Sequence, residues 1–352
     1  MPRNKMNLKH LILAFALFSI GCQQKEPNES QQNHLEPLTN TPPVTDITDD
    51  RDLIDDEPKL RQFKFVYGGA ISELQPGALV SIWLPVAADT HEQEVLDREI
   101  NVPGEYVIDE EAKFGNRILH FKATANKDGE VPFEVTYNIS RREAIREQGE
   151  ALSEGETKLF KQATSFVPVD KELSADVLGD TNLADDPLTA GRQIYDAINQ
   201  RMQYDKPEGK AWGRGDSVWA CGNGFGNCTD FHSLFISVCR EQNIAARFEI
   251  GFPIPSKIGA GEVSGYHCWA KFEAGNQWVP VDISEADKDP TLTDYYYGNL
   301  TANRVTFTTG RDLKLTPEQE AGPVNFLVYP YAEVEGKVHT TFRKRFQYED
   351  VQ

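Results

Sequence analysis

Residues 62–144 alternate apolar and polar side chains with a period of two, and this pattern constrains the fold more than any other feature of the chain. The alternation is concentrated in short runs, which are residues 63–67, 79–85, 118–121 and 131–137. Successive side chains of a strand point to opposite faces, so each run predicts a half-buried strand. Short strands separated by Gly and Asp/Asn turns predict a β-sandwich domain over residues 61–145. This region contains no cluster of Cys, His or paired carboxylates, which favours a structural, positioning or partner-binding role.

Length and charge narrow the remaining choices. A chain of 352 residues predicts about two domains. The 36 basic residues are outnumbered by 55 acidic ones, which argues against nucleic acid as a partner because phosphate neutralisation needs clustered Lys and Arg. Five cysteines are too few to form a disulfide scaffold.

The N-terminus has the order of a secretory signal. Residues 1–10 carry three basic residues and no acid, and the apolar run over residues 11–20 is too short to span a bilayer. The run ends in Ser-Ile-Gly-Cys, which resembles a bacterial lipobox. That resemblance implies that residues 1–21 are a lipoprotein signal peptide, that Cys22 is lipidated, and that the protein is extracytoplasmic and anchored to a bacterial membrane. A plain signal peptide cleaved elsewhere, with Cys22 incidental, is the alternative.

Residues 22–60 are predicted to be a disordered acidic tether. They contain ten acidic and three basic residues, several prolines and no aromatic residue. Such a composition cannot bury enough apolar surface to fold. The tether would hold the folded part away from an anionic membrane surface.

The chain after residue 145 begins irregularly and then becomes helical. Residues 145–185 are polar and predicted to be irregular, whereas Asp186 followed by Pro187 predicts the start of a helix. The Gly-rich residues 204–227 are predicted to be a loop. Alternating segments within residues 325–351 are predicted to add strands to the C-terminal domain.

A second helix is predicted to begin at Cys228. Apolar residues recur with helical spacing after it, at Phe231, Leu234, Phe235 and Val238. Asn227 is suited to cap this helix. The helix dipole and the free N–H groups at its start favour a thiolate, so the pKa of Cys228 is expected to be low.

Two polar side chains in the following strands complete a possible catalytic set. Alternating runs at residues 265–272 and 277–282 flank a Gly/Asn turn, which predicts a hairpin. The hairpin would bring His267 and Asp282 onto neighbouring strands. A cysteine at a helix start, a histidine and an acid are the nucleophile, the base and the residue that orients the base in thiol catalysis.

Four segments with these residues resemble the transglutaminase-like superfamily of papain-fold cysteine enzymes. They are Gly-Asn-Cys-Thr-Asp-Phe-His at 226–232, Ile-Ala-Ala-Arg at 244–247, Tyr-His-Cys-Trp at 266–269 and Trp-Val-Pro-Val-Asp at 278–282. The resemblance implies an α+β fold, in which the N-terminal β-sandwich is followed by a papain-like catalytic domain over residues 185–350. It also implies Cys228 as nucleophile, His267 as general base and Asp282 as orienter.

The resemblance leaves the reaction open, because members include amine-acceptor crosslinkers, peptidases, amidases and inactive relatives. The expected substrate is a peptide or glutamine-type amide of a protein or peptide, attacked through a thioacyl intermediate, and no cofactor is implied. The competing hypothesis is a catalytically silent scaffold that binds a protein partner in the periplasm. The Cys228 N–H is one candidate oxyanion donor. The second donor is left open among four upstream residues, which are Trp212, Trp219, Asn223 and Asn227.

The other cysteines and His232 have less specific interpretations. His232 is predicted to be a structural hydrogen bonder behind the nucleophile. A metal site with Cys221, Cys239, His267 and Cys268 is the alternative, but no metal-ligand spacing supports it. Cys239 and Cys268 are predicted to be core residues, with Cys268 facing away from His267. At most one disulfide could form among these two and Cys221, and the sequence does not choose it.

Overall fold

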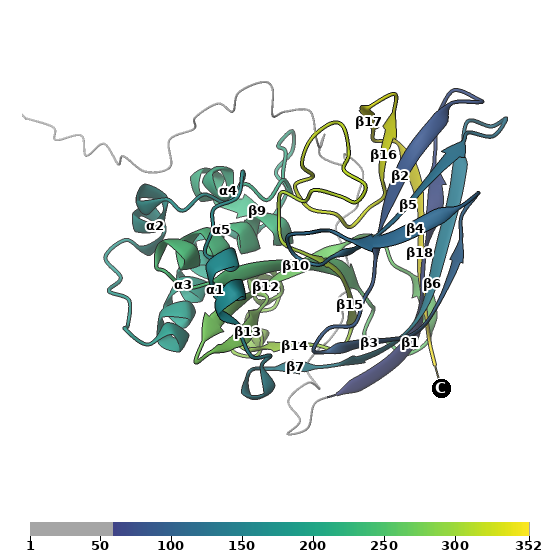
Figure 1. Ribbon diagram of the computed structural model, residues 1–352. Coiled ribbons are helices and arrows are strands. Elements are labelled where there is room, and N and C mark those ends of the chain that lie inside the picture. Colours follow the sequence, from purple (N-terminus) through teal and green to yellow (C-terminus); the bar gives the residue numbers. More distant parts are fainter. Residues whose placement is uncertain (1–58, 352) are drawn as a thin grey trace, which may run out of the picture.

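The computed structural model describes residues 59–351, which form a mixed α/β fold with many strands and short helices (Figure 1). The predicted signal peptide, Cys22 and the predicted tether up to residue 58 lie outside the described residues. Within the described part, no helix combines the length and the apolar character needed to cross a membrane.

Two five-stranded antiparallel sheets contain the alternating segments predicted from the sequence. Their strand orders are β11-β18-β1-β6-β3 and β17-β16-β2-β5-β4. The N-terminal strands are β1 (Leu60–Ile71), β2 (Leu79–Val86), β3 (Gln93–Asn101), β4 (Tyr106–Glu110), β5 (Arg117–Thr124) and β6 (Val131–Arg142). In β6 every second residue from Val131 to Arg141 is buried, as the period of two requires.

The C-terminal strands belong to these two sheets. They are β16 (Tyr331–Val334), β17 (Lys337–His339) and β18 (Phe342–Asp350). β18 pairs with β1 and β16 pairs with β2, so the prediction that residues 325–351 extend the C-terminal domain is wrong. Alternation shows that a segment is a strand but does not show which sheet it joins, because the pairing partner lies more than 250 residues away in the chain.

A separate four-stranded sheet carries the second half of the fold. Its order is β13-β12-β10-β15. The strands are β10 (Ala246–Pro253), β12 (His267–Ala274), β13 (Gln277–Val281) and β15 (Arg304–Thr309), and β11 (Ala260–Glu262) pairs instead with β18. Four short two-residue strands form two further ladders, which are β7 (Ala144–Ile145) with β14 (Asn299–Leu300) and β8 (Gln203–Tyr204) with β9 (Phe225–Gly226).

Helices pack beside this sheet at the left of Figure 1. They are α1 (Glu154–Phe160), α2 (Lys171–Leu178), α3 (Pro187–Arg201), α4 (Ser217–Asn223), α5 (Cys228–Glu241) and α6 (Ile283–Lys288), with 3₁₀ turns η3 (Arg146–Gln148) and η4 (Pro290–Leu292). α5 is buried over nearly its whole length, and Phe235 on α5 contacts Phe272 on β12. The first residues of α5 therefore lie against the start of β12.

Side-chain caps explain where the helices begin. The Asp186 carboxylate accepts from Thr189 N–H, which confirms the predicted helix start at Pro187. The prediction that residues 145–185 are irregular is wrong, because Ser153 and Asp170 cap α1 and α2. The loop predicted over residues 204–227 likewise contains α4, which is capped by Asp216.

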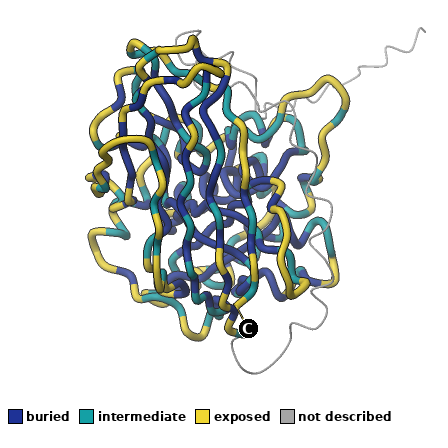
Figure 2. The backbone as a smooth tube through the Cα atoms, turned by 90° about the vertical axis from the view of Figure 1, so that its right-hand side faces the viewer, coloured by how far each residue is buried: buried dark blue, intermediate teal, exposed yellow. Residues whose placement is uncertain are grey.

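One hydrophobic core runs through all three large sheets and the helices beside them. Buried residues therefore extend through the molecule from one end to the other, and exposed residues lie mainly in loops and outer strands (Figure 2). The four-stranded sheet packs against the two five-stranded sheets without a break in this core. The two five-stranded sheets therefore hold the four-stranded sheet in a fixed position.

Candidate active site

The start of α5 holds Cys228 at its first helical position. Asn227 caps the helix by accepting from Thr229 N–H, and Asp230 completes a capping box by accepting from Asn227 N–H. Within residues 59–351, the N–H groups of residues 227 and 229–231 all have acceptors, whereas that of Cys228 has none. The Cys228 N–H is therefore free to donate to a ligand.

Asp230 also fixes the loop that precedes α4. Its carboxylate accepts from Gly213 N–H at 2.7 Å and from Gly215 N–H at 3.0 Å. Burial raises the pKa of Asp230 to about 6, although the N–H groups that it accepts from oppose the shift. This carboxylate therefore couples the loop to the first turn of the nucleophile helix.

His267 and Asp282 meet as the hairpin prediction requires. His267 is the first residue of β12, and its Nε2 lies 2.7 Å from Asp282 Oδ2. Asp282 does not lie in β13 but follows it and caps α6, where it accepts from Glu285 N–H. Both side chains are buried, so their hydrogen bond is shielded from water.

Arg304 on β15 belongs to the site, although the sequence reasoning gave it no role there. Its Nη1 lies 3.2 Å from Asp282 Oδ2, and its guanidinium stacks over the Trp269 ring at 4.8 Å. Burial by itself raises the pKa of Asp282, but His267 and Arg304 outweigh it and hold the pKa well below its usual range. Asp282 therefore stays ionised opposite His267.

The structure brings Cys228 to His267 as an acid–base pair. Burial raises the pKa of the Cys228 thiol, but hydrogen bonds to Cys268 and His267 and the charge of His267 lower it to about 5. Burial lowers the pKa of His267, but Asp282 and the Cys228 thiolate raise it to about 10. Between these values the pair is a thiolate and an imidazolium, which is the reactive form of a cysteine nucleophile.

His232 links the two ends of the site, as the sequence predicted for a hydrogen bonder behind the nucleophile. Its Nδ1 lies 2.7 Å from the Cys228 carbonyl, and its Nε2 accepts from Ile283 N–H at 3.1 Å. The ring therefore donates from Nδ1 and accepts at Nε2. It is fully buried, and burial lowers its pKa to about 4, so it stays neutral.

Cys268 lies in the site and is more than the core residue that was predicted. It is fully buried and faces away from His267 along β12, but this is the face that carries α5. Its thiol lies 3.7 Å from His232 Nδ1 and helps to lower the pKa of Cys228. Cys239 and Cys268 are both free, so neither forms the disulfide that the sequence left open.

Tyr204 is a second group that sequence reasoning missed. It pairs with Gly226 in the β8–β9 ladder and is only half-buried, and Lys288 Nζ lies 4.0 Å over its ring. Burial raises the pKa of Tyr204, and the charge of Cys228 raises it further. Among the hydrogen bonds of the described residues, none involves this hydroxyl.

Two of the four predicted oxyanion donors are already occupied. The Asn223 amide donates to the Trp219 carbonyl at 2.8 Å, and the Asn227 amide donates to the Tyr266 hydroxyl at 3.1 Å. Trp219 packs edge-on against Phe225 in the wall before α5. Trp212 contacts Tyr204, so these two rings line the same side of the nucleophile.

The residues that could hold a metal ion share only His267 with the set considered from the sequence. Within residues 59–351, His267, Asp282 and Glu285 bring ligand atoms within 4.8 Å of one another. Their carboxylates already pair with cations, because Asp282 contacts Arg304 and Glu285 contacts Lys288 at 2.7 Å. The arrangement is therefore balanced as an ion-pair cluster around His267.

Comparison with known proteins agrees with this geometry. Residues 173–283 match the transglutaminase-like superfamily. That segment contains the start of α5, the start of β12 and Asp282, so the match covers every member of the candidate set.

Two relatives extend beyond that segment. An uncharacterized protein of Haemophilus influenzae is 29% identical over 332 residues, which cover 77% of this chain and 85% of the relative. A solved candidate cysteine protease from Cytophaga hutchinsonii covers 83% of this chain and 98% of its own, with a TM-score of 0.52 and 15% identity. At that identity the second match concerns the fold alone.

Proposed function

We propose that the protein is an enzyme with a cysteine nucleophile, which cleaves or transfers peptide or glutamine-type amides. The observation that carries the proposal is the buried 2.7 Å hydrogen bond between His267 Nε2 and Asp282, together with the interaction of His267 with Cys228 that lowers the pKa of the thiol. A fully silent scaffold has no need for a thiol whose pKa is lowered to about 5.

The reaction begins with attack of the Cys228 thiolate on the amide carbonyl. The oxyanion accepts from the Cys228 N–H and from the Tyr204 hydroxyl, two donors that have no hydrogen-bond partner within residues 59–351. His267 then donates its proton to the leaving amine, and a thioacyl intermediate remains on Cys228. Asp282 and Arg304 keep the imidazole in place while its charge changes.

The second step decides the product. His267, now neutral, accepts a proton from the incoming nucleophile. Attack by water gives hydrolysis, and attack by a lysine-type amine gives transamidation. Both outcomes use the same residues, so the acceptor determines which reaction occurs.

We also propose a cellular setting for this chemistry. Cys22 is a lipid anchor, residues 22–60 form an acidic tether, and the substrate is a protein or peptide outside the cytoplasm of a bacterium. The two five-stranded sheets are interpreted as a β-sandwich that positions the catalytic domain. Their buried strands, which share one core with α5, support this interpretation.

A transfer and hydrolysis assay tests the proposed function. The full-length protein is incubated with a glutamine-containing protein and a fluorescent amine, and incorporated amine and released ammonia are measured together. Wild type is expected to release ammonia in either reaction, with one amine incorporated per ammonia if it transfers and no amine incorporated if it hydrolyses, whereas Cys228→Ser and His267→Ala produce neither signal. Equal signals in wild type and Cys228→Ser would contradict the enzyme proposal and favour the scaffold that binds a protein partner.

A further inference from the structure

Two free thiols lie at the start of α5 and at the start of β12, on either side of the His232 ring nitrogen that contacts both residues. Cys228 is the first residue of the helix, and Cys268 is the second residue of the strand. Both are at most 2% exposed, and neither forms a disulfide in the reduced site. The mechanism above uses only one of them.

His232 fixes the position of the second thiol relative to the first residue of α5. The His232 Nδ1 lies 2.7 Å from the Cys228 carbonyl and 3.7 Å from Cys268 Sγ. Because the same ring atom contacts both cysteines, Cys268 cannot move away without breaking this contact. The third free thiol, Cys239, lies near the end of α5, three turns further along.

We infer that Cys268 is a resolving cysteine, which forms a reversible disulfide with Cys228 when a peroxide oxidises the nucleophile. The inference shares with the proposed function only the reactive thiol at Cys228. It needs no amide substrate and no particular acceptor.

The oxidation proceeds in two balanced steps. The Cys228 thiolate attacks one peroxide oxygen, an S–O bond forms and the O–O bond breaks, and the departing hydroxide takes the proton of the His267 imidazolium. Cys268 sulfur then attacks Cys228 sulfur, an S–S bond forms and the S–O bond breaks, and the thiol proton leaves with that oxygen as water. One peroxide is reduced to two equivalents of water, or to water and an alcohol, while two thiols are oxidised.

The surroundings favour this outcome over further oxidation of Cys228. Cys268 is fully buried and contacts His232 on α5, so the resolving thiol is already in place when a peroxide oxidises Cys228. A sulfenic acid next to a thiol is captured as a disulfide, whereas an isolated one proceeds to sulfinic acid. The disulfide would protect the nucleophile and silence it until a dithiol reduces it.

Peptide mapping of the full-length protein tests the inference. Reduced protein is treated with hydrogen peroxide, remaining thiols are alkylated under denaturing conditions, and trypsin cuts after Arg240 and Lys257. A cross-linked pair of peptides, residues 215–240 and 258–271, is expected, with fragment ions placing the bond at Cys228. Dithiothreitol is expected to restore alkylation of Cys228 in the native protein.

Two variants give matched controls. Cys268→Ser is expected to lose the cross-link, to carry sulfinic acid at Cys228 and to regain no reactivity with dithiothreitol. Cys239→Ser is expected to behave like wild type. Recovery of Cys268 as an alkylated thiol beside sulfinic Cys228 in wild type would overturn the inference, whether or not either variant folds. The amide assay on untreated protein then reports separately on the proposed function.

Discussion

Two buried clusters of charged residues share strand β12. They differ in whether a proton can move from one side chain to another. At the start of the strand, His267 interacts with Cys228 and Asp282, and Asp282 also pairs with Arg304. Further along, Lys271 meets Glu92 at 2.8 Å and Glu249 at 3.6 Å, where the sheet of β12 contacts the N-terminal sheets. Both clusters are almost fully shielded from water.

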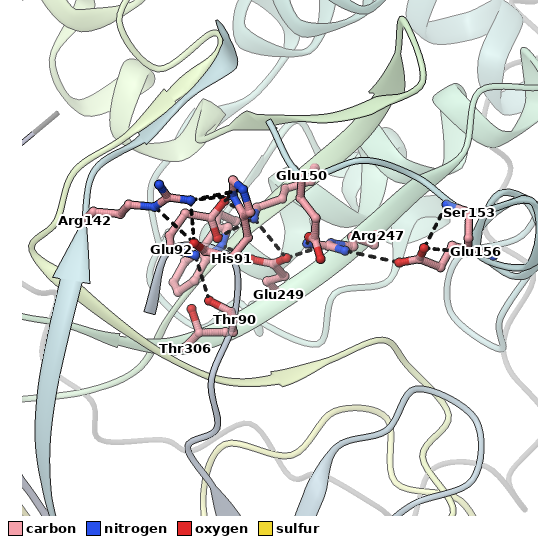
Figure 3. A network of polar contacts seen from close by, with 12 residues as sticks. Thr90, His91, Glu92, Arg142, Glu150, Ser153, Glu156, Arg247, Glu249 and Thr306 are labelled. Carbon is pink, nitrogen blue, oxygen red and sulfur yellow. Dashed lines mark hydrogen bonds and ion pairs between the residues drawn. The ribbon is translucent and has the colours of Figure 1, made fainter. Parts of the chain in front are cut away.

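The second cluster continues as a chain of paired charges, which Figure 3 shows from close by. Arg247 contacts Glu249 at 2.8 Å and Glu150 at 2.7 Å, and it approaches Glu156 at 3.8 Å. Burial raises the pKa of Glu92, but Lys271 and Arg141 outweigh it and keep the carboxyl ionised. Each carboxylate in this chain has a permanent cation, so no proton is available near neutral pH.

In the first cluster, one proton can be bound either by the Cys228 sulfur or by the His267 ring. Cys228 and His267 hold it as a thiolate–imidazolium pair between about pH 5 and pH 10, and within residues 59–351 the Cys228 N–H and the Tyr204 hydroxyl have no hydrogen-bond partner. Burial and charge are therefore common to both clusters. The cluster around His267 differs from the cluster around Lys271 in having a proton that can move between two side chains and, within residues 59–351, hydrogen-bond donors without an acceptor.

The largest effect on turnover is expected from a change at Asp282, which holds the His267 imidazolium. Asp282→Asn keeps the size of the side chain but removes the charge that raises the pKa of His267, and the turnover number should fall by about 10³–10⁴-fold. Steady-state kinetics on an amide substrate measure it. Asp180→Asn, a change at an exposed aspartate just after α2, is the matched control and should retain turnover within about twofold.

Turnover that is unchanged in Asp282→Asn would show that the carboxylate does not orient His267. The pH profile gives a second check. Loss of Asp282 should lower the pKa of His267, so the alkaline limb of activity should move to lower pH.

A change in the cluster around Lys271 should affect the stability of the protein and not the reactivity of Cys228. Lys271→Met leaves Glu92 and Glu249 buried without their shared cation, which should reduce the free energy of unfolding by about 3–5 kcal/mol. Urea unfolding measures it, with the exposed Lys64→Met on β1 as control. Alkylation of Cys228 in the folded variant should match wild type, and a large loss of reactivity would contradict the separation of the two clusters.

A smaller effect is expected at the unoccupied donor. Tyr204→Phe removes only the hydroxyl, and the turnover number should fall by about 10²-fold with little change in KM, because the oxyanion exists only along the reaction. Its alkylation rate should stay at the wild-type value, since the hydroxyl does not form the thiolate. Tyr266→Phe, whose hydroxyl already pairs with Asn227, is the matched variant and should lose less turnover.

The features of the site that the sequence predicted depend on a local residue pattern or on one hairpin. The start of α5 follows from the apolar stripe after Cys228 and the capping side chain of Asn227. The meeting of His267 with Asp282 follows from the short turn between β12 and β13. Both depend on residues that are close together in the chain.

What the sequence could not predict depends on distant segments. Arg304 reaches Asp282 because β15 pairs with β10, and β18 lies beside β1 from the opposite end of the chain. The position of Cys268 required knowledge of which face of β12 carries α5. Alternation specifies that a strand has two faces but not what covers each of them.

The rate of Cys228 alkylation by iodoacetamide as a function of pH tests the central claim most directly. The thiolate is the reactive form, and its folded-state pKa of about 5 predicts a rate that rises through that pH and is flat to about pH 9. His267→Ala should shift the rise toward the ordinary cysteine pKa of about 8.5, and Cys239→Ser should leave the curve unchanged. A wild-type rate that rises only near pH 8.5, with no response to loss of His267, would contradict the account of Cys228 as an activated nucleophile.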